Sequence, residues 1–151
     1  MKRLWLAFAA VAAMIPDVIG AQQIDVSNVI DRPNCLIDVE VKLLDLRDSS
    51  VGPTQPNLSR RIPTEVRIRY NGAAVELPAG FAEIFWDASR ILPLGDDRTC
   101  GFQVDRGDAS TSNRIRVSLG GKRIRKVERF DLKGRVVSTT TFSYPGPVVI
   151  D

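Results

Sequence analysis

Basic side chains are concentrated in one stretch of the C-terminal third, where they could bind an anion. Residues 114–135 contain nine Lys and Arg residues and two acidic residues, so their local charge is +7 in a chain whose net charge is +3. Cations at this density favour carboxylate, sulfate or phosphate ligands. The predicted contact residues are Arg114, Arg116, Arg123, Arg125, Lys126 and Arg129.

The same stretch contains a predicted two-residue hairpin turn at Gly120-Gly121. This turn would place Val117 opposite Ile124. It would also place Arg116 opposite Arg125, and like charges that face each other across two strands destabilise a sheet. A protein that keeps such a pair neutralises it with nearby carboxylates, protects a sheet edge with it, or binds a negatively charged partner with it.

The function that this pattern favours is a non-enzymatic binding protein, of the inhibitor or immunity type, that contacts an acidic protein or an anionic component of the cell envelope. The alternative is a module that binds an anionic glycan or lipid headgroups. Nucleic acid is a less suitable partner, because Phe130 is the only aromatic residue in the basic stretch and single strands are bound on several aromatic side chains.

Catalytic chemistry has one candidate pair of carboxylates. Glu83 and Asp87 would share a helix face at i, i+4 spacing, with Trp86 beside them as a sugar platform. This pattern defines a third alternative, a small carbohydrate-active hydrolase. The chain has no His, so it lacks the commonest general base and the commonest zinc ligand. The favoured function requires no catalytic residue, no cofactor and no metal.

Two cysteines, Cys35 and Cys100, are present in the chain. An oxidising compartment favours a disulfide between them. The bridge would close a loop of about 65 residues, and in the chain-entropy model such a loop stabilises the fold by about 4 kcal/mol. A catalytic thiol is the alternative, but the chain has no His to activate it.

Residues 1–21 have the pattern of a secretory signal peptide. Lys2 and Arg3 precede the apolar stretch Leu4–Ile15, which is shorter than the roughly 20 residues of a membrane-spanning helix. We therefore expect a periplasmic or secreted protein whose mature part, residues 22–151, forms a single β domain with a net charge of +2. An uncleaved N-terminal anchor is the alternative.

Strand signals dominate residues 22–151. In Cys35–Leu46, apolar residues alternate with charged ones, and a shift of the apolar parity predicts a bulge or strand end near Leu43-Leu44. Asn71-Gly72 predicts a hairpin turn within residues 64–77. The Pro- and Ser-rich residues 47–63 predict a long polar loop, either a disordered excursion or a binding loop. Residues 80–91 fit both a helix and a strand, and we expect one short helix there.

Residues 114–144 predict a meander of three antiparallel strands. Within it, the hexapeptide Phe130–Arg135 resembles the core of a YD-type repeat, which reads aromatic-Asp-x-x-Gly-Arg before a strand. The resemblance covers this one turn and implies a strand–turn–strand unit. Together these signals predict a mainly β fold, an antiparallel sandwich or partly open barrel of about seven strands.

Overall fold

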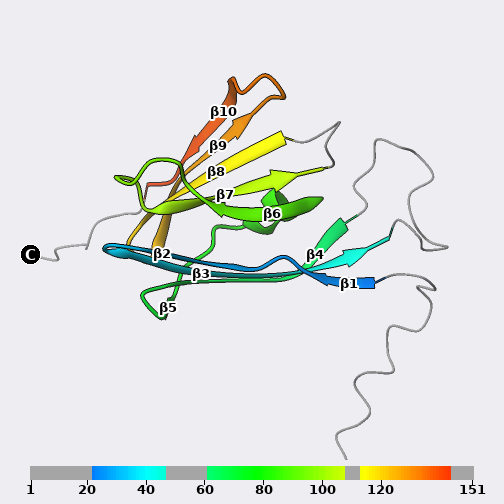
Figure 1. The fold of residues 1–151 in the computed structure, drawn as a ribbon, viewed down its shortest axis with the longest axis horizontal. Coiled ribbons are helices and arrows are strands. Elements are labelled where there is room, and N and C mark those ends of the chain that lie inside the picture. Colours follow the sequence, from blue (N-terminus) through cyan, green and yellow to red (C-terminus); the bar gives the residue numbers. More distant parts are fainter. Residues whose placement is uncertain (1–21, 47–60, 108–112, 144–151) are drawn as a thin grey trace, which may run out of the picture.

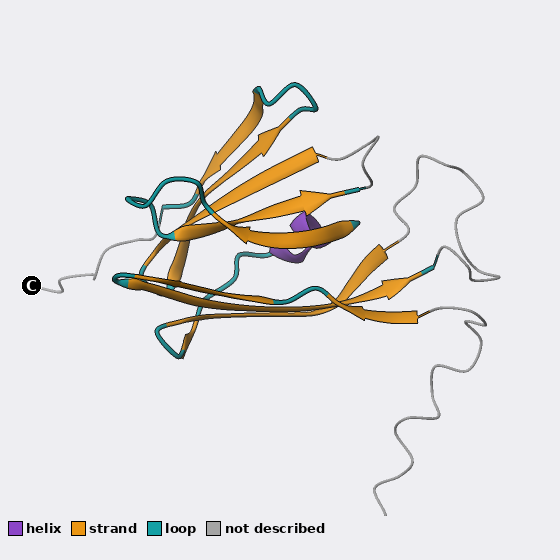
Figure 2. Ribbon diagram, viewed as in Figure 1, coloured by secondary structure: helices purple, strands orange, loops and turns teal. Residues whose placement is uncertain are grey.

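Two antiparallel sheets make up the fold (Figure 1). The computed structural model describes residues 22–46, 61–107 and 113–143. Each sheet has five strands, and the 3₁₀ helix η1 (Phe81–Phe85) lies between the sheets (Figure 2). The mainly β prediction is confirmed, and the architecture is a sandwich rather than a closed barrel. The described strands outnumber the predicted seven, and they include β6 (Ala88–Pro93), which lies where a helix was predicted.

The first sheet is centred on one long strand whose side chains alternate between the two faces. Its strands are β1 (Gln22–Asp25), β2 (Asn28–Arg32), β3 (Cys35–Asp45), β4 (Arg61–Tyr70) and β5 (Ala73–Ala74). Every second residue of β3 is buried from its first residue to its last, as period-two alternation predicts. Asn71 and Gly72 both have positive φ, which confirms the predicted hairpin turn between β4 and β5.

The second sheet is a meander that follows the chain order. Its strands are β6 (Ala88–Pro93), β7 (Gly101–Arg106), β8 (Asn113–Gly120), β9 (Arg123–Phe130) and β10 (Val136–Thr141). The last three strands confirm the predicted C-terminal meander. Strand β10 forms one edge of this sheet and β6 forms the other.

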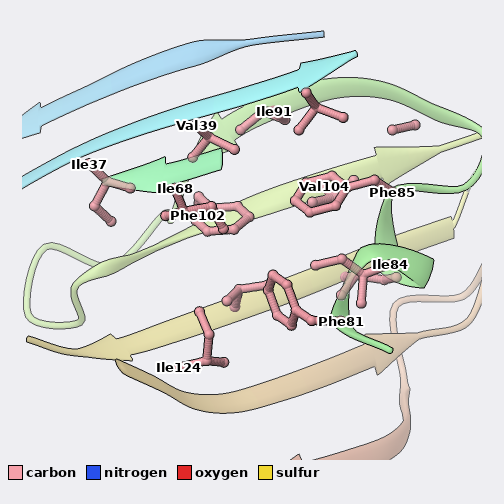
Figure 3. Close-up of a cluster of buried hydrophobic side chains, with 14 of the residues drawn as sticks. Ile37, Val39, Ile68, Phe81, Ile84, Phe85, Ile91, Phe102, Val104 and Ile124 are labelled. Atoms are coloured by element: carbon pink, nitrogen blue, oxygen red, sulfur yellow. The ribbon is translucent and has the colours of Figure 1, made fainter. Parts of the chain in front are cut away.

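The inward faces of the two sheets share one hydrophobic core (Figure 3). Phe85 from η1 is fully buried, and its ring stacks against Phe102 of β7 with centroids 6.2 Å apart. Phe81 meets Phe85 edge-on at 6.1 Å. The short helix therefore fills the space between the sheets with aromatic side chains, which contribute large apolar areas to the core.

A disulfide joins Cys35, at the start of β3, to Cys100, immediately before β7. The predicted pairing is confirmed, and it connects the two sheets covalently across a sequence separation of 65.

Three local predictions differ from the structure. The bulge near Leu43 lies in β4, where Thr64 is the extra residue, while β3 keeps its alternation through Asp45. The helix predicted over 80–91 is only the five residues of η1, because Asp87 has positive φ and Ala88 begins a strand. Pro63 belongs to β4, so the predicted loop 47–63 is shorter at its end.

Two predicted segments fall largely or wholly outside the described ranges. The signal peptide, residues 1–21, lies outside the described residues, as does the rest of the predicted loop, residues 47–60. Within the described ranges, no helix is long and apolar enough to cross a membrane.

Candidate binding face on the second sheet

The pairing of β8 with β9 differs from the prediction. Residue Gly120 pairs with Arg123, and the register shifts so that Arg125 is an extra residue in β9. Arg116 therefore lies opposite Glu128, and the predicted pairs of Arg116 with Arg125 and of Val117 with Ile124 are wrong.

The physical reason for this bulge is the core. Ile124 and Val127 are both buried although they are three residues apart, and a regular strand would put them on opposite faces. One extra residue between them restores the inward direction of Val127. The bulge also leaves both Arg125 and Lys126 outside the core.

Arg114 and Arg116 lie on the outer face of the second sheet. They alternate along β8 with Ile115 and Val117, which are buried in the core. The Arg116 guanidinium carbon is 5.9 Å from the centroid of the Phe130 ring, which is a cation–π distance. Arg114 is the direct cross-strand neighbour of the same Phe130.

The carboxylates of this face pair with other partners. Asp105 accepts a hydrogen bond from Arg90 at 2.7 Å and one from Gln103 at 2.8 Å. Glu128 pairs with Lys126 at 2.9 Å. Among the described residues, no carboxylate forms an ion pair with Arg114, Arg116 or Arg125.

One further carboxylate, Asp96, lies near this face. Its pKa is lowered chiefly by the hydrogen bond from the Thr99 hydroxyl and then by the Arg98 N–H, while the charge of Arg116 contributes least. The Asp96 oxygens are therefore already engaged by their own turn, at 2.7 Å from the Thr99 hydroxyl and 2.6 Å from the Arg98 nitrogen. Asp96 influences Arg116 only at a distance.

Two of the other predicted contact residues, Arg123 and Arg129, are not part of the basic face that carries Arg114 and Arg116. Arg123 pairs with Glu76 at 4.0 Å, at the seam between the two sheets. Arg129 lies opposite Ile115, so it faces the same side as the core. The pKa of Arg106 is lowered chiefly by burial and, to a smaller extent, by the charge of Arg129. The basic residues of the outer face are therefore Arg114, Arg116, Arg125 and Lys126.

Apolar side chains adjoin this basic face. Leu132, Val136 and Val137 are exposed, at 67%, 50% and 62%. Leu132 lies in the turn between β9 and β10, and Val136 and Val137 come directly after that turn. The Asp131 carboxylate stabilises the turn, because it accepts hydrogen bonds from the Lys133 N–H and from the Arg135 N–H and Nε, each at 2.9 Å. This turn has the strand–turn–strand form that the YD-type resemblance implies.

A hollow of about 480 Å³, which no pattern in the sequence indicated, lies at the far end of β10. Its lining consists of Gly120, Arg123, Arg125, Thr141, Phe142 and Ser143. The Arg125 side chain folds close over Gly120, where a Cβ would lie 2.1 Å from the Arg125 Nε. Glycine at this position thus lets a guanidinium line the hollow.

The carboxylates considered for hydrolysis do not share a helix face. Glu83 lies in η1, whereas Asp87 follows the helix with a φ of 57°. The Asp87 carboxylate accepts a hydrogen bond from the Arg61 N–H at 3.0 Å. The i, i+4 arrangement beside Trp86 is therefore wrong, and Asp87 connects η1 to β4. Within the described ranges, no group of three or more acidic, His or Cys side chains could hold a metal ion.

No family model, curated protein or solved structure matches this chain.

Proposed function

We propose that this protein is a non-enzymatic, exported binding protein that contacts an acidic protein partner through the outer face of its second sheet. The supporting observation is that Arg114 and Arg116 lie side by side on that face without an ion-pair partner among the described residues. Arg116, whose guanidinium lies over the Phe130 ring, can still donate hydrogen bonds to a carboxylate of a partner. The disulfide supports the export part of the proposal, because such bonds persist in oxidising compartments.

A protein partner is favoured over a glycan or lipid headgroup by the apolar side chains beside the arginines. Leu132, Val136 and Val137 are exposed, and Val136 is the cross-strand neighbour of Phe130, whose ring lies beneath the Arg116 guanidinium. Protein interfaces are enriched in arginine and aromatic residues and include an apolar centre. An inhibitor or immunity-type protein that blocks an acidic surface fits this composition.

The proposal is tested by binding at two ionic strengths with a charge-matched control. Partners are captured from periplasmic extract or culture fluid, and the dissociation constant of the purified complex is then measured. Binding should weaken steeply between about 0.05 and 0.5 M salt, because exposed charges are screened beyond the Debye length. Replacing Arg114 and Arg116 by Ser should weaken it at least about tenfold.

The control replaces Arg67 and Arg69 by Ser, which removes the same charge with the same spacing from the first sheet. These arginines already pair with described carboxylates, Arg67 with Glu65 at 2.8 Å and Arg69 with Glu40 at 3.5 Å. Equal loss in both double variants would show that only net charge matters and would overturn the assignment of the face. Binding of anionic vesicles or a sulfated glycan that depends on Arg114 and Arg116 would support the alternative ligand classes instead.

A further inference from the structure

Strand β10 is an open sheet edge. All six residues of Val136–Thr141 are exposed, and β9 is the only described strand that pairs with them. Figure 1 shows β10 at the margin of the second sheet, away from the first sheet. An open edge is a template on which another extended chain can add a strand.

The hydrogen-bond pattern shows which backbone groups this edge offers. The Phe142 N–H donates to the Arg125 carbonyl at 2.8 Å, so Phe142 points its backbone groups toward β9. In an antiparallel ladder this direction alternates along a strand, and Thr140, which pairs with Val127, shares it. Thr139 and Thr141 therefore direct their N–H and C=O groups away from β9, toward the open side.

Two other edges are protected in ways that β10 is not. Strand β6 ends in Pro93, and the Asn28 side chain donates to its Ile91 carbonyl at 2.8 Å. Strand β4 contains Pro63 and is partly covered by β5. Proline and charged residues are the usual protection of a sheet edge. Strand β10 contains neither, and its bulge lies at its first residues.

Charge identifies the occupant as acidic. The Thr141 side chain shares the outer face with its cross-strand neighbour Lys126, which pairs with Glu128 on the same strand. The hollow lined by Arg125, which forms no ion pair with a described carboxylate, lies at the same end of β10. An added strand would lie about 10 Å from β9, two strand spacings away, which is within reach of these long side chains and a facing carboxylate. A second copy of β10 has no acidic residue in Val136–Thr141, so the strand itself would bring no carboxylate to these cations.

We propose that the acidic partner adds an extended segment to the open edge of β10, as a sixth strand of the second sheet. This inference rests on the proposed function and specifies how the partner binds. Main-chain bonds to Thr139 and Thr141 give affinity. Acidic side chains directed at Arg125, and at Lys126 in place of its present partner Glu128, give specificity.

The experiment uses the disulfide-bonded protein labelled with ¹⁵N and a peptide of about eight alternating Glu and Val residues, the length of an ordinary strand. The same peptide with N-methyl groups on every amide keeps its charge but has no N–H to donate on either edge, so it cannot complete a ladder. We expect the unmodified peptide to slow exchange of the Thr139 and Thr141 amide protons at least about tenfold, with little change at Thr140, which is already paired. The methylated peptide should bind about five- to tenfold more weakly.

A protein variant gives an independent test. Thr139→Pro removes an outward N–H without removing a ladder bond and should weaken binding about five- to tenfold, whereas the control Thr139→Val should bind as the wild type does. Equal binding of both peptides would overturn strand addition, and that result does not depend on whether the proline variant folds.

Two other outcomes distinguish this inference from the proposed function. If Thr139→Pro binds normally while the Arg114 and Arg116 double variant does not, the basic face stands and the added strand is wrong. If no acidic peptide binds and sedimentation shows a dimer that Thr139→Pro dissociates, the edge binds a second copy and the acidic occupant is wrong.

Discussion

Removal of the disulfide gives a direct measure of what holds the two sheets together. Cys35 and Cys100 connect β3 of the first sheet to the start of β7 across a sequence separation of 65. In the unfolded chain this bridge closes a loop of that length, and its loss should lower the free energy of unfolding by about 4 kcal/mol. A domain of ordinary stability has about 5–15 kcal/mol in total, so the double Ala variant should be close to unfolding at body temperature.

The assay is urea unfolding followed by the fluorescence of Trp86, which is 39% exposed and adjoins the buried helix η1. The midpoint should fall and the slope m should rise, because the unfolded chain without the bridge exposes more surface. The melting temperature should fall by about 10–20 °C. Wild-type protein with reduced and alkylated cysteines is the control. A loss below about 1 kcal/mol would refute the reasoning, since the core alone would then hold the sheets in place.

Two further predictions test the packing and the turn that support the candidate face. Gly101→Ala would place a methyl group 2.0 Å from the Val117 carbonyl oxygen, so it should cost about 1–3 kcal/mol in urea unfolding. Gly95→Ala, which meets nothing within 4 Å, should stay within about 0.5 kcal/mol of wild type. Hydrogen bonds from Arg135 lower the pKa of Asp131, so its charge stabilises the fold fully above pH about 4 and loses this effect as the pH falls through the lowered value. Asp131→Asn should therefore lower the melting temperature at pH 7 but not at a pH below that value, and a difference that persists in acid would show that the charge is not the cause.

The sequence contained enough information for most of the strands, because their signals are local, but not for β6, whose residues also fit a helix. The alternation along β3 and the meander of β8, β9 and β10 both follow from which side chains face the core. The turn at Asn71-Gly72 follows from residues that tolerate positive φ. The disulfide followed from a chain with two cysteines.

The basic residues of the candidate face were identifiable from sequence, but their partners were not. Counting from Gly120-Gly121 placed Arg116 opposite another arginine, whereas the bulge at Arg125 places it opposite Glu128. The spacing of Ile124 and Val127 was the available signal for that bulge, since both are apolar and a regular strand cannot bury both.

What the sequence determined by itself is therefore most of the strands, their inward faces and the concentration of positive charge, because each depends on residues close together in the chain. Only the tertiary structure decided which cations are neutralised, since Asp105 and Glu128 reach the face from β7 and β9 and pair with Arg90 and Lys126. It also decided that β10 is left with an open side. Cross-strand register and edge position depend on packing between distant segments, and that packing is fixed only when the whole core is assembled.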